Sequence, residues 1–321
     1  MNLRSACREP THVVFETKNR ITGSVMKQMK WVLAATMIFC GASVFTACSN
    51  EDTPVAPEKS LPKISKVYSA TMVKAERKVG DQWMTLYENV SERALLYDFQ
   101  WTGDRLESIR IPEREKSPER LWLLTYDNQY RIINAKLSNT RHNFAYEYDA
   151  QGRLARMIET MPWDNTVDHV YTTTYTYNGD KLAKSVKTSE LNGGEDVSPT
   201  ASLKEVTTYA WQGENVVSMT IESDLLNGDH SAESYSYEYN TLLNPFQHDL
   251  LIQTGVYSMA GIKGAYLSKN LTKTTTVGPS IYDYQYITEG DRVVSIVRDN
   301  TTEASAIRAT THGVYDLEYV E

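Results

Sequence analysis

A single thiol, that of Cys48, has the setting for a covalent modification. The sequence of 321 residues contains three cysteines, and the other two, Cys7 and Cys40, lie before it. After residue 48 the chain therefore offers no second sulfur for an internal disulfide or for a thiolate metal site. A cysteine that becomes the first residue of a processed chain can carry a diacylglyceryl group on its sulfur. This is the chemistry that we expect for Cys48.

The residues before Cys48 have the pattern of a secretory signal peptide. Residues 31–44 form an apolar run without a charge, Lys30 precedes the run and the small residue Ala47 follows it. Basic, apolar and small residues in this order are typical of such signals. The run is too short to cross a hydrocarbon layer comfortably, because that takes about 20 apolar residues. The stretch resembles a lipobox, with Phe45 where leucine is usual, so the sequence predicts cleavage before Cys48 and lipidation of its thiol. The alternatives are an ordinary secreted protein with an incidental cysteine and, less favoured, an uncleaved signal anchor.

This signal divides the chain into four segments. Residues 1–25 are polar and precede the basic part of the signal, so we interpret them as an over-annotated start. Residues 26–47 are the predicted signal peptide. Residues 48–62 contain three prolines and few apolar side chains, which predicts a disordered, extended tether. Residues 63–321 remain for a single domain.

Charge excludes two classes of partner. The chain has 33 basic and 41 acidic residues, for a net charge of −8. Residues 1–47 hold six basic and two acidic ones, so the remainder carries 27 against 39, or −12. An acidic chain without a basic cluster argues against nucleic acid as a partner and against electrostatic binding to anionic lipid. Attachment to a membrane would then depend on the lipid of Cys48.

The pair Glu51-Asp52, just after Cys48, bears on the side of the membrane. It resembles the short acidic signals that send Bacteroidetes lipoproteins to the outer face of the outer membrane. A plain solvated linker is the alternative. We expect a lipid anchor in the outer membrane, with the cell surface favoured over the periplasmic face.

No residue pattern for catalysis stands out. The sequence has no nucleophile elbow, no His-Glu-x-x-His and no phosphate-binding loop. The histidines of the domain lack ligand spacing and are expected on the surface or in loops: His142, His169, His230, His248 and His312. The loop 192–196 could offer oxygens to calcium, but a plain flexible loop is the preferred interpretation. We therefore predict no enzymatic activity, no catalytic residues, no metal site and no cofactor.

An aromatic stripe is the feature with binding potential. Tyrosine and tryptophan rings stack well on sugars and other flat apolar faces. The six candidates for such contacts are Trp101, Tyr148, Tyr177, Trp211, Tyr239 and Tyr286. The alternative, which we favour, is that these rings form a cross-strand ladder in the core.

The stripe belongs to a repeat that predicts the elements of the domain. Copies such as residues 146–157 and 175–186 have two aromatics two positions apart, then Asn, Asp and Gly, then a basic and an aliphatic residue. Residues two apart share one face of a strand, and Asn, Asp and Gly favour tight turns. Each copy is therefore predicted to be a β-hairpin that packs against its neighbours.

One spacing leaves two alternatives open. Leu106 and Ile109 are three apart, as are Leu154 and Met157, so strict alternation cannot place both members of a pair on one face. Either a bulge follows each turn, or the first leucine fills the end of the hairpin.

These hairpins predict an all-β domain. Tyrosine outnumbers phenylalanine 21 to 6, threonine-rich runs favour strands, and no long helical pattern competes. We expect a large antiparallel meander or barrel-like sheet of about fourteen to sixteen strands, built from successive β-hairpins.

The cadence Tyr-Asp-x-x-Gly-Arg-Leu of residues 148–154 resembles the tyrosine–aspartate repeat of Rhs-type shell proteins. The domain as a whole resembles a family of Bacteroidetes lipoprotein domains of unknown function with a porin-like fold. That likeness rests on the lipobox, the hairpin cadence, residues 239–246 with their Asn-Pro-Phe, and residues 265–271. It implies a porin-like fold and carries over no catalytic residues. The copies at Tyr126, without a turn glycine, and at Tyr209, without a basic residue after the turn, depart from the repeat.

Two classes of function remain. The first is a lipid-anchored, non-enzymatic domain of the cell envelope that binds a glycan or a peptide. The second is a structural or accessory subunit of an outer-membrane complex. A hydrolase is a distant third. An exposed aromatic cleft would favour the first class, and a large apolar patch would favour the second.

Overall fold

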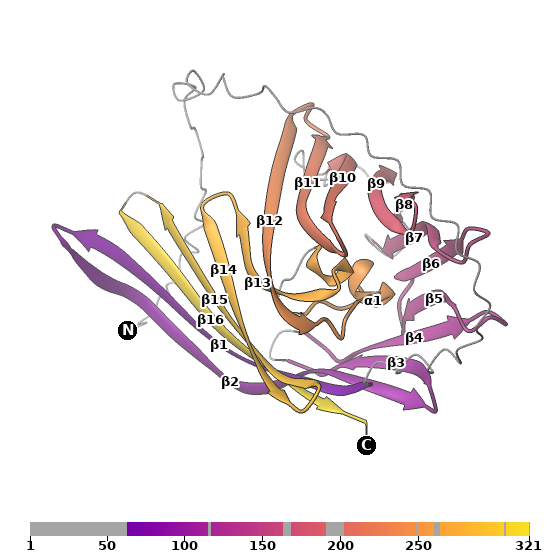
Figure 1. The fold of residues 1–321 in the computed structure, drawn as a ribbon, viewed down its shortest axis with the longest axis horizontal. Coiled ribbons are helices and arrows are strands. Elements are labelled where there is room, and N and C mark those ends of the chain that lie inside the picture. Colours follow the sequence, from indigo (N-terminus) through magenta and orange to yellow (C-terminus); the bar gives the residue numbers. More distant parts are fainter. Residues whose placement is uncertain are drawn as a thin grey trace, which may run out of the picture. The chain divides into compact units, whose positions relative to one another are not determined.

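The structure is a computed structural model, and it describes residues 63–114, 117–162, 168–190, 202–247, 249–259, 264–304 and 306–320 (Figure 1). These residues form sixteen strands and two short helical segments. The strands are β1 (Ile64–Val79), β2 (Gln82–Thr102), β3 (Arg105–Ile111), β4 (Arg120–Tyr126), β5 (Ile132–Leu137), β6 (Asn143–Tyr148), β7 (Leu154–Pro162), β8 (Asp168–Asn178), β9 (Lys181–Glu190), β10 (Ser202–Gln212), β11 (Asn215–Leu225), β12 (His230–Leu243), β13 (Asn270–Val277), β14 (Ser280–Glu289), β15 (Arg292–Ala304) and β16 (Ile307–Tyr319). The helical segments are α1 (Leu250–Gln253) and the 3-10 turn η1 (Ala265–Leu267).

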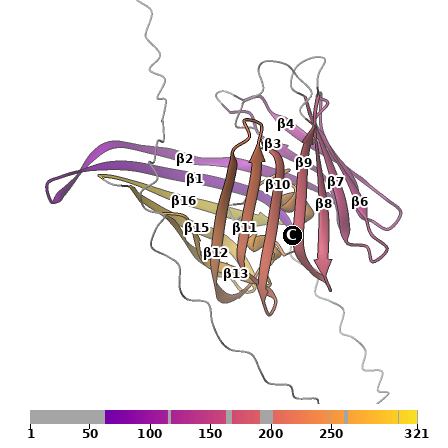
Figure 2. The same ribbon diagram turned by 90° about the horizontal axis from the view of Figure 1, so that it is seen from above.

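The strands form a closed antiparallel barrel, which confirms the predicted all-β hairpin architecture. Each strand pairs with the next one along the chain, and β16 pairs with β1 to close the circle. Figure 2 shows the strands side by side around the wall. No helix in the described part of the chain is long and apolar enough to cross a membrane.

A β-bulge follows the turn in the hairpins, and this decides between the two alternatives for the three-residue spacing. Opposite Gln100 lies Ser108, but opposite Trp101 lies Leu106, so one residue of β3 is extra at this point. Leu106 and Ile109 are consequently both buried. The hairpin β6–β7 has the same shift, and both Leu154 and Met157 are buried there.

The turns use positive φ angles, as the repeat predicts. Gly152 has φ +80° and Gly179 has φ +60°. In the turn of β6–β7 the N–H of Gly152 donates to the Asp149 carbonyl at 3.0 Å, and the Asp149 carboxylate accepts the N–H of Arg153 at 2.8 Å. The turn of β4–β5 has the same hydrogen bonds but no glycine. Tyr130 occupies the glycine position there, with φ +61°.

Replacing Tyr130 with glycine should stabilise the domain. The left-handed conformation costs a residue with a Cβ about 1–2 kcal/mol, and the Tyr130 side chain is 79% exposed and so loses little packing. Part of the gain is offset by the greater freedom of glycine in the unfolded chain. We expect Tyr130→Gly to raise the free energy of unfolding by about 0.5–1 kcal/mol, measured by urea titration. Gln129→Gly in the same turn is the control and should lower it. Equal losses in both variants would contradict a strained backbone at Tyr130.

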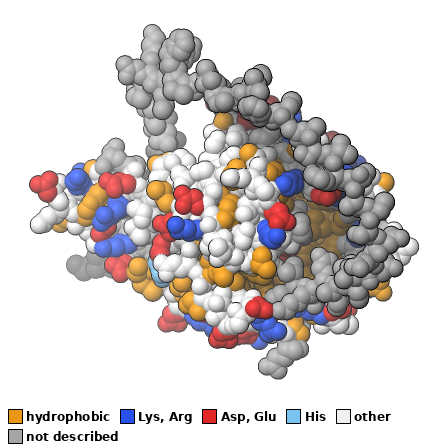
Figure 3. Space-filling model, in the orientation of Figure 1, with side chains coloured by type: hydrophobic (Ala, Val, Ile, Leu, Met, Phe, Trp, Pro, Cys, Tyr) orange, Lys and Arg blue, Asp and Glu red, His pale blue; other side chains and the backbone are white. Residues whose placement is uncertain are grey.

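Most large apolar side chains point into the barrel, and the outer face carries polar side chains with smaller apolar ones such as Val186 and Val206 among them. The core includes Val67, Ile109, Phe144 and Ile296, each at most 3% exposed. Strand residues alternate between faces, so the outer wall over β8–β11 carries side chains such as Thr172, Thr174, Thr176, Lys184 and Glu222. Charged side chains are scattered over the visible wall in Figure 3. Membrane-spanning barrels have the opposite arrangement, with an apolar band outside and a polar lumen.

The connection from β12 to β13 folds into the barrel, and we call residues 244–247, 249–259 and 264–269 the plug. Asp249 caps α1 by accepting the N–H groups of Leu251 and Ile252 at 2.9 and 3.1 Å, and it accepts the hydroxyl of Tyr257. Burial raises the pKa of the Asp249 carboxyl. The hydroxyls of Tyr146 and Thr254 lie 3.2 Å apart and tie the plug to the wall.

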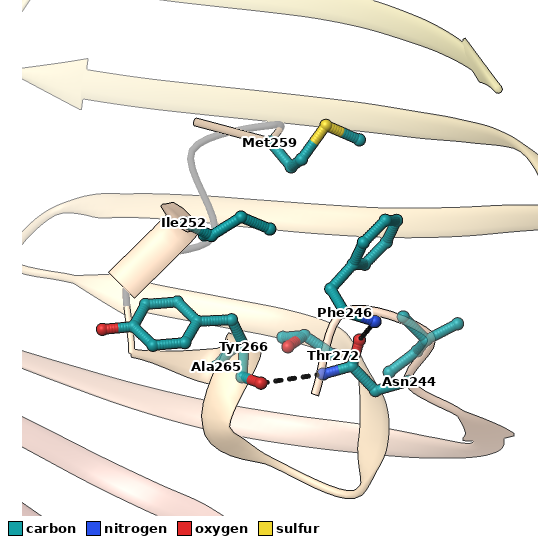
Figure 4. Close-up of a pocket in the computed structure, with 8 residues that line it drawn as sticks. Asn244, Phe246, Ile252, Met259, Ala265, Tyr266 and Thr272 are labelled. Atoms are coloured by element: carbon teal, nitrogen blue, oxygen red, sulfur yellow. Dashed lines mark hydrogen bonds between the residues drawn. The ribbon is translucent and has the colours of Figure 1, made fainter. Parts of the chain in front are cut away.

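Inside the plug the packing is tight. Figure 4 shows Ile252, Met259 and Tyr266 around a void of about 10 Å³, which has room for no more than one water molecule. The Asn244 amide donates to the Tyr266 carbonyl at 3.3 Å and its oxygen accepts the N–H of Phe246 at 2.9 Å. The plug therefore has a fixed internal structure despite its short helices.

The hairpin β1–β2 projects beyond the rest of the wall (Figures 1 and 2). We call residues 73–90 the blade. In the described part of the chain, β3 pairs with β2 only from Asp98 to Thr102, so the blade part of β2 has a ladder partner only in β1. Met84, Tyr87 and Val90 on this strand are each more than half exposed. The blade thus combines an open strand edge with exposed apolar side chains.

Candidate functional site

The six aromatic candidates lie around one end of the barrel, where the hairpin turns are. Each donates its polar hydrogen to a backbone carbonyl of a neighbouring strand. The hydroxyl of Tyr148 reaches the Ile132 carbonyl at 2.7 Å, and the indole N–H of Trp101 reaches the Ile64 carbonyl at 2.8 Å. The others follow the same rule: Tyr177 to Leu154, Trp211 to Leu182, Tyr239 to Val216 and Tyr286 to Thr272. We call this set of six residues the aromatic belt.

Basic residues of the repeat pack on the aromatic belt. The Arg131 guanidinium lies 4.6 Å from the centroid of Tyr148, and that of Arg153 lies 4.6 Å from the centroid of Tyr177. The basic residue of one hairpin thus covers the aromatic residue of the next. Burial raises the pKa of Tyr148 to about 12, so its phenol stays protonated and can donate. These contacts account for the Tyr and Arg positions of the repeat as links between hairpins.

This placement bears on the predicted ligand-binding role without deciding it. All six side chains have polar atoms engaged with the wall, and their binding role stays a prediction. Cys48, the predicted lipidation site, lies outside the described residues, as do the loop 192–196 and His248.

A larger space lies between the plug and the strands β7–β11. Its volume is about 500 Å³. We call it the cavity. Figure 3 shows a hollow with hydrophobic lining in the region where α1 lies in Figure 1. The wall contributes mainly Met157, Tyr175, Leu182, Tyr209, Met219 and Ile221, and the plug contributes mainly Ile252, Met259 and Tyr266.

A polar row crosses the wall of the cavity. Lys187 faces Thr173 on one side and Glu205 on the other, directly across the ladders. The Lys187 ammonium is 3.8 Å from a carboxylate oxygen of Glu159 and 4.4 Å from the ring centroid of Tyr171. The Glu159 carboxylate also contacts the His142 imidazole at 3.0 Å. Hydroxyl groups of Thr173, Ser185 and Thr207 lie among these charges and the apolar surface.

The cavity residues are not among the six candidates, although Tyr175 and Tyr209 belong to the aromatic stripe of the repeat. Tyr175 and Tyr209 are the first aromatics of their pairs, whereas the candidates were second members. Burial raises the pKa of both phenols, so they remain neutral. Small polar residues at inward positions mark the cavity in the sequence. Thr173, Ser185 and Thr207 occupy places where other strands have large side chains.

The histidines only partly follow their prediction. His230 and His312 lie on the outer wall, next to Asp224 and Asp299. His169, however, lies within β8 and is 2% exposed. The expectation of a surface or loop position was wrong for this residue, because its place in the strand alternation turns it inward while Asp168 binds Arg141 outside. Among the described residues no group of His, Cys, Asp and Glu is arranged to hold a metal ion.

Comparison with solved structures finds likenesses of fold, among them likenesses to two porin-like proteins. No family model and no curated protein matches the sequence. A porin-like protein from Bacteroides uniformis matches with a TM-score of 0.44 and 15% identity, over 81% of this chain and 100% of the other. A porin-like protein from Bacteroides vulgatus matches with a TM-score of 0.33 and 13% identity, over 81% and 99%. The lipoprotein family and the Rhs-type repeat stay predictions, and function is argued from the residues of this chain.

Proposed function

We propose that this chain is a lipid-anchored protein of the cell envelope, held at the outer membrane, whose barrel binds a glycan or a short peptide without acting on it. The cavity carries the proposal. Its volume of about 500 Å³ lies within the usual range of roughly 300–1,000 Å³ for ligand sites. Its lining is mostly apolar and aromatic with a few polar groups, which is the usual composition of such sites.

The lining suits both ligand classes. The rings of Tyr175, Tyr209 and Tyr266 can stack on the apolar face of a sugar or on a peptide side chain. The hydroxyls of Ser185 and Thr207 offer hydrogen bonds beside them. Binding without catalysis is the form that we propose, because the described residues that line the cavity show no hydrogen-bonded pair of nucleophile and base.

The outer wall supports the anchoring part of the proposal. Its Thr, Lys and Glu side chains interrupt the apolar ones, such as Val186 and Val206, so the wall over β8–β11 lacks the continuous apolar band of a membrane-spanning barrel. Attachment would then fall to the lipid on Cys48, with Glu51-Asp52 directing the domain to the cell surface.

A pair of adjacent threonines provides the test. Thr207 lines the cavity and Thr208 points out of the wall. A ligand that binds the folded state raises the melting temperature by mass action. We expect a glycan or peptide from a thermal-shift screen to lose its effect in Thr207→Phe, which fills the cavity, and to keep it in Thr208→Phe. The melting curves of both variants without ligand establish that they fold.

Two results would count against the proposal. One is a ligand whose effect survives Thr207→Phe unchanged, which would place its site elsewhere. The other is a broad panel in which no glycan and no peptide shifts the wild-type melting temperature at millimolar concentration.

The role of accessory subunit stays a prediction, and the blade is the surface that favours it. An open strand edge can accept a strand from another protein, and Met84, Tyr87 and Val90 would be covered in such a complex. The cavity is the stronger observation, because its volume and lining suit a ligand.

A further inference from the structure

We propose that the cavity selects amphipathic cations, with the ligand's ammonium group beside Glu205 and its apolar body against the plug. This inference rests on the proposed function, since it names the chemistry of the ligand for the same cavity. Charge, burial and the shape of the lining each contribute to it.

Glu205 is a half-buried carboxylate in the cavity wall. Within the described ranges no hydrogen bond or ion pair engages it, although Lys187 lies directly across the ladder. The Lys187 ammonium is instead within 3.8 Å of Glu159 and over the ring of Tyr171. Lys187 therefore compensates Glu159, and the charge of Glu205 is left for a group that enters the cavity.

Between β7 and β12 the charge on the described inward positions of the wall is negative. From β7 to β12 the described inward positions include Glu159, Glu205 and Glu233 against Lys187. Glu233 lies on the same face as Ile221, which lines the cavity, and accepts the hydroxyl of Tyr235. A concave surface with low-dielectric walls strengthens the field of such charges. A cation gains from this field and an anion loses.

The remaining lining suits an apolar body that carries a cation. Met157, Met219 and Met259 line the space, and methionine side chains adapt to varied apolar shapes. The faces of Tyr175 and Tyr209 can hold an ammonium group through cation–π contact. A neutral sugar would use these rings but not the charge of Glu205.

The test uses the full chain with Cys48→Ser, which carries no lipid and needs no detergent. The neutral dye N-phenyl-1-naphthylamine reports on the cavity through its fluorescence. Decyltrimethylammonium, decanol and decanoate, each below its micelle concentration, are then compared as displacing ligands. We expect the cation to displace half of the dye at a concentration at least ~10-fold below the one that decanol needs. This ratio corresponds to a difference in binding free energy of about 1.4 kcal/mol. Decanoate should be the weakest of the three.

Glu205→Gln should reduce that preference for the cation to about two-fold or less, while dye binding is kept. Glu222→Gln is the matched control, because Glu222 points outward from the adjacent strand β11 and is exposed, and it should leave the preference unchanged. Equal displacement by the cation and decanol, or a preference that survives Glu205→Gln, overturns this inference and leaves the cavity as a ligand site. If the dye fails to bind, or binds equally well to Thr207→Phe, both this inference and the proposed ligand site in the cavity are overturned.

Discussion

Truncating Tyr148 to alanine should lower the free energy of unfolding by about 3 kcal/mol, the lower end of the range for large aromatic truncations. The side chain is partly buried, donates to the Ile132 carbonyl at 2.7 Å and lies under the Arg131 guanidinium. Its loss would leave a gap between two hairpins and remove the contact that joins them. Urea titration followed by tryptophan fluorescence measures the change.

Tyr148→Phe separates the ring from its hydroxyl. It keeps the packing and loses one hydrogen bond, so we expect a cost of about 1 kcal/mol. Tyr130→Ala is the control for removing a tyrosine, because Tyr130 is 79% exposed, and its effect should stay within about ±0.5 kcal/mol. If Tyr148→Ala kept its stability and lost ligand binding, the aromatic belt would be a binding surface rather than a link between hairpins.

Replacing Cys48 with serine should abolish metabolic labelling with fatty acid and release the domain from membranes. A single lipid anchor is the only attachment that we expect, since polar side chains interrupt the apolar ones on the outer wall over β8–β11 and the chain is acidic. Fractionation of cells and immunoblotting measure the distribution. Cys40→Ser, within the predicted signal peptide, is the control and should leave the protein in the membrane fraction. Membrane association of Cys48→Ser in the absence of label would show that another part of the chain holds it there.

The wall of the barrel could be predicted because its information is local. An aromatic pair, a turn and an aliphatic residue recur within each hairpin, and the bulge that joins Leu106 to Ile109 on one face was one of the two alternatives that the spacing allowed. The order of the strands follows from the hairpins, since each strand pairs with its neighbour in the chain. Closure of the sheet needed the pairing of β1 with β16, which no local pattern contains.

The plug and the cavity could not be predicted for the same reason. The plug has no periodic apolar pattern, and its key carboxylate, Asp249, looks like a surface residue in the sequence although burial raises its pKa. Lys187 and Glu205 lie on strands joined by a long connection. Only the register of β9 with β10 places them face to face. The size of the cavity depends on how the plug fills the barrel, which is a property of the packed whole.

The pairing of β1 with β16 has a consequence for how the chain is made. These strands hold the two ends of the domain together from Ile64 to Tyr319, so the hairpins can form one by one but the circle cannot close until the last strand is available. Long-range pairing of this kind is slow, because the entropy of bringing distant segments together must be overcome first. A chain that the predicted signal peptide sends through a translocon must pass it unfolded. If the predicted signal is used, late closure would keep the domain unfolded during export and would leave completion of the barrel to the compartment beyond the membrane.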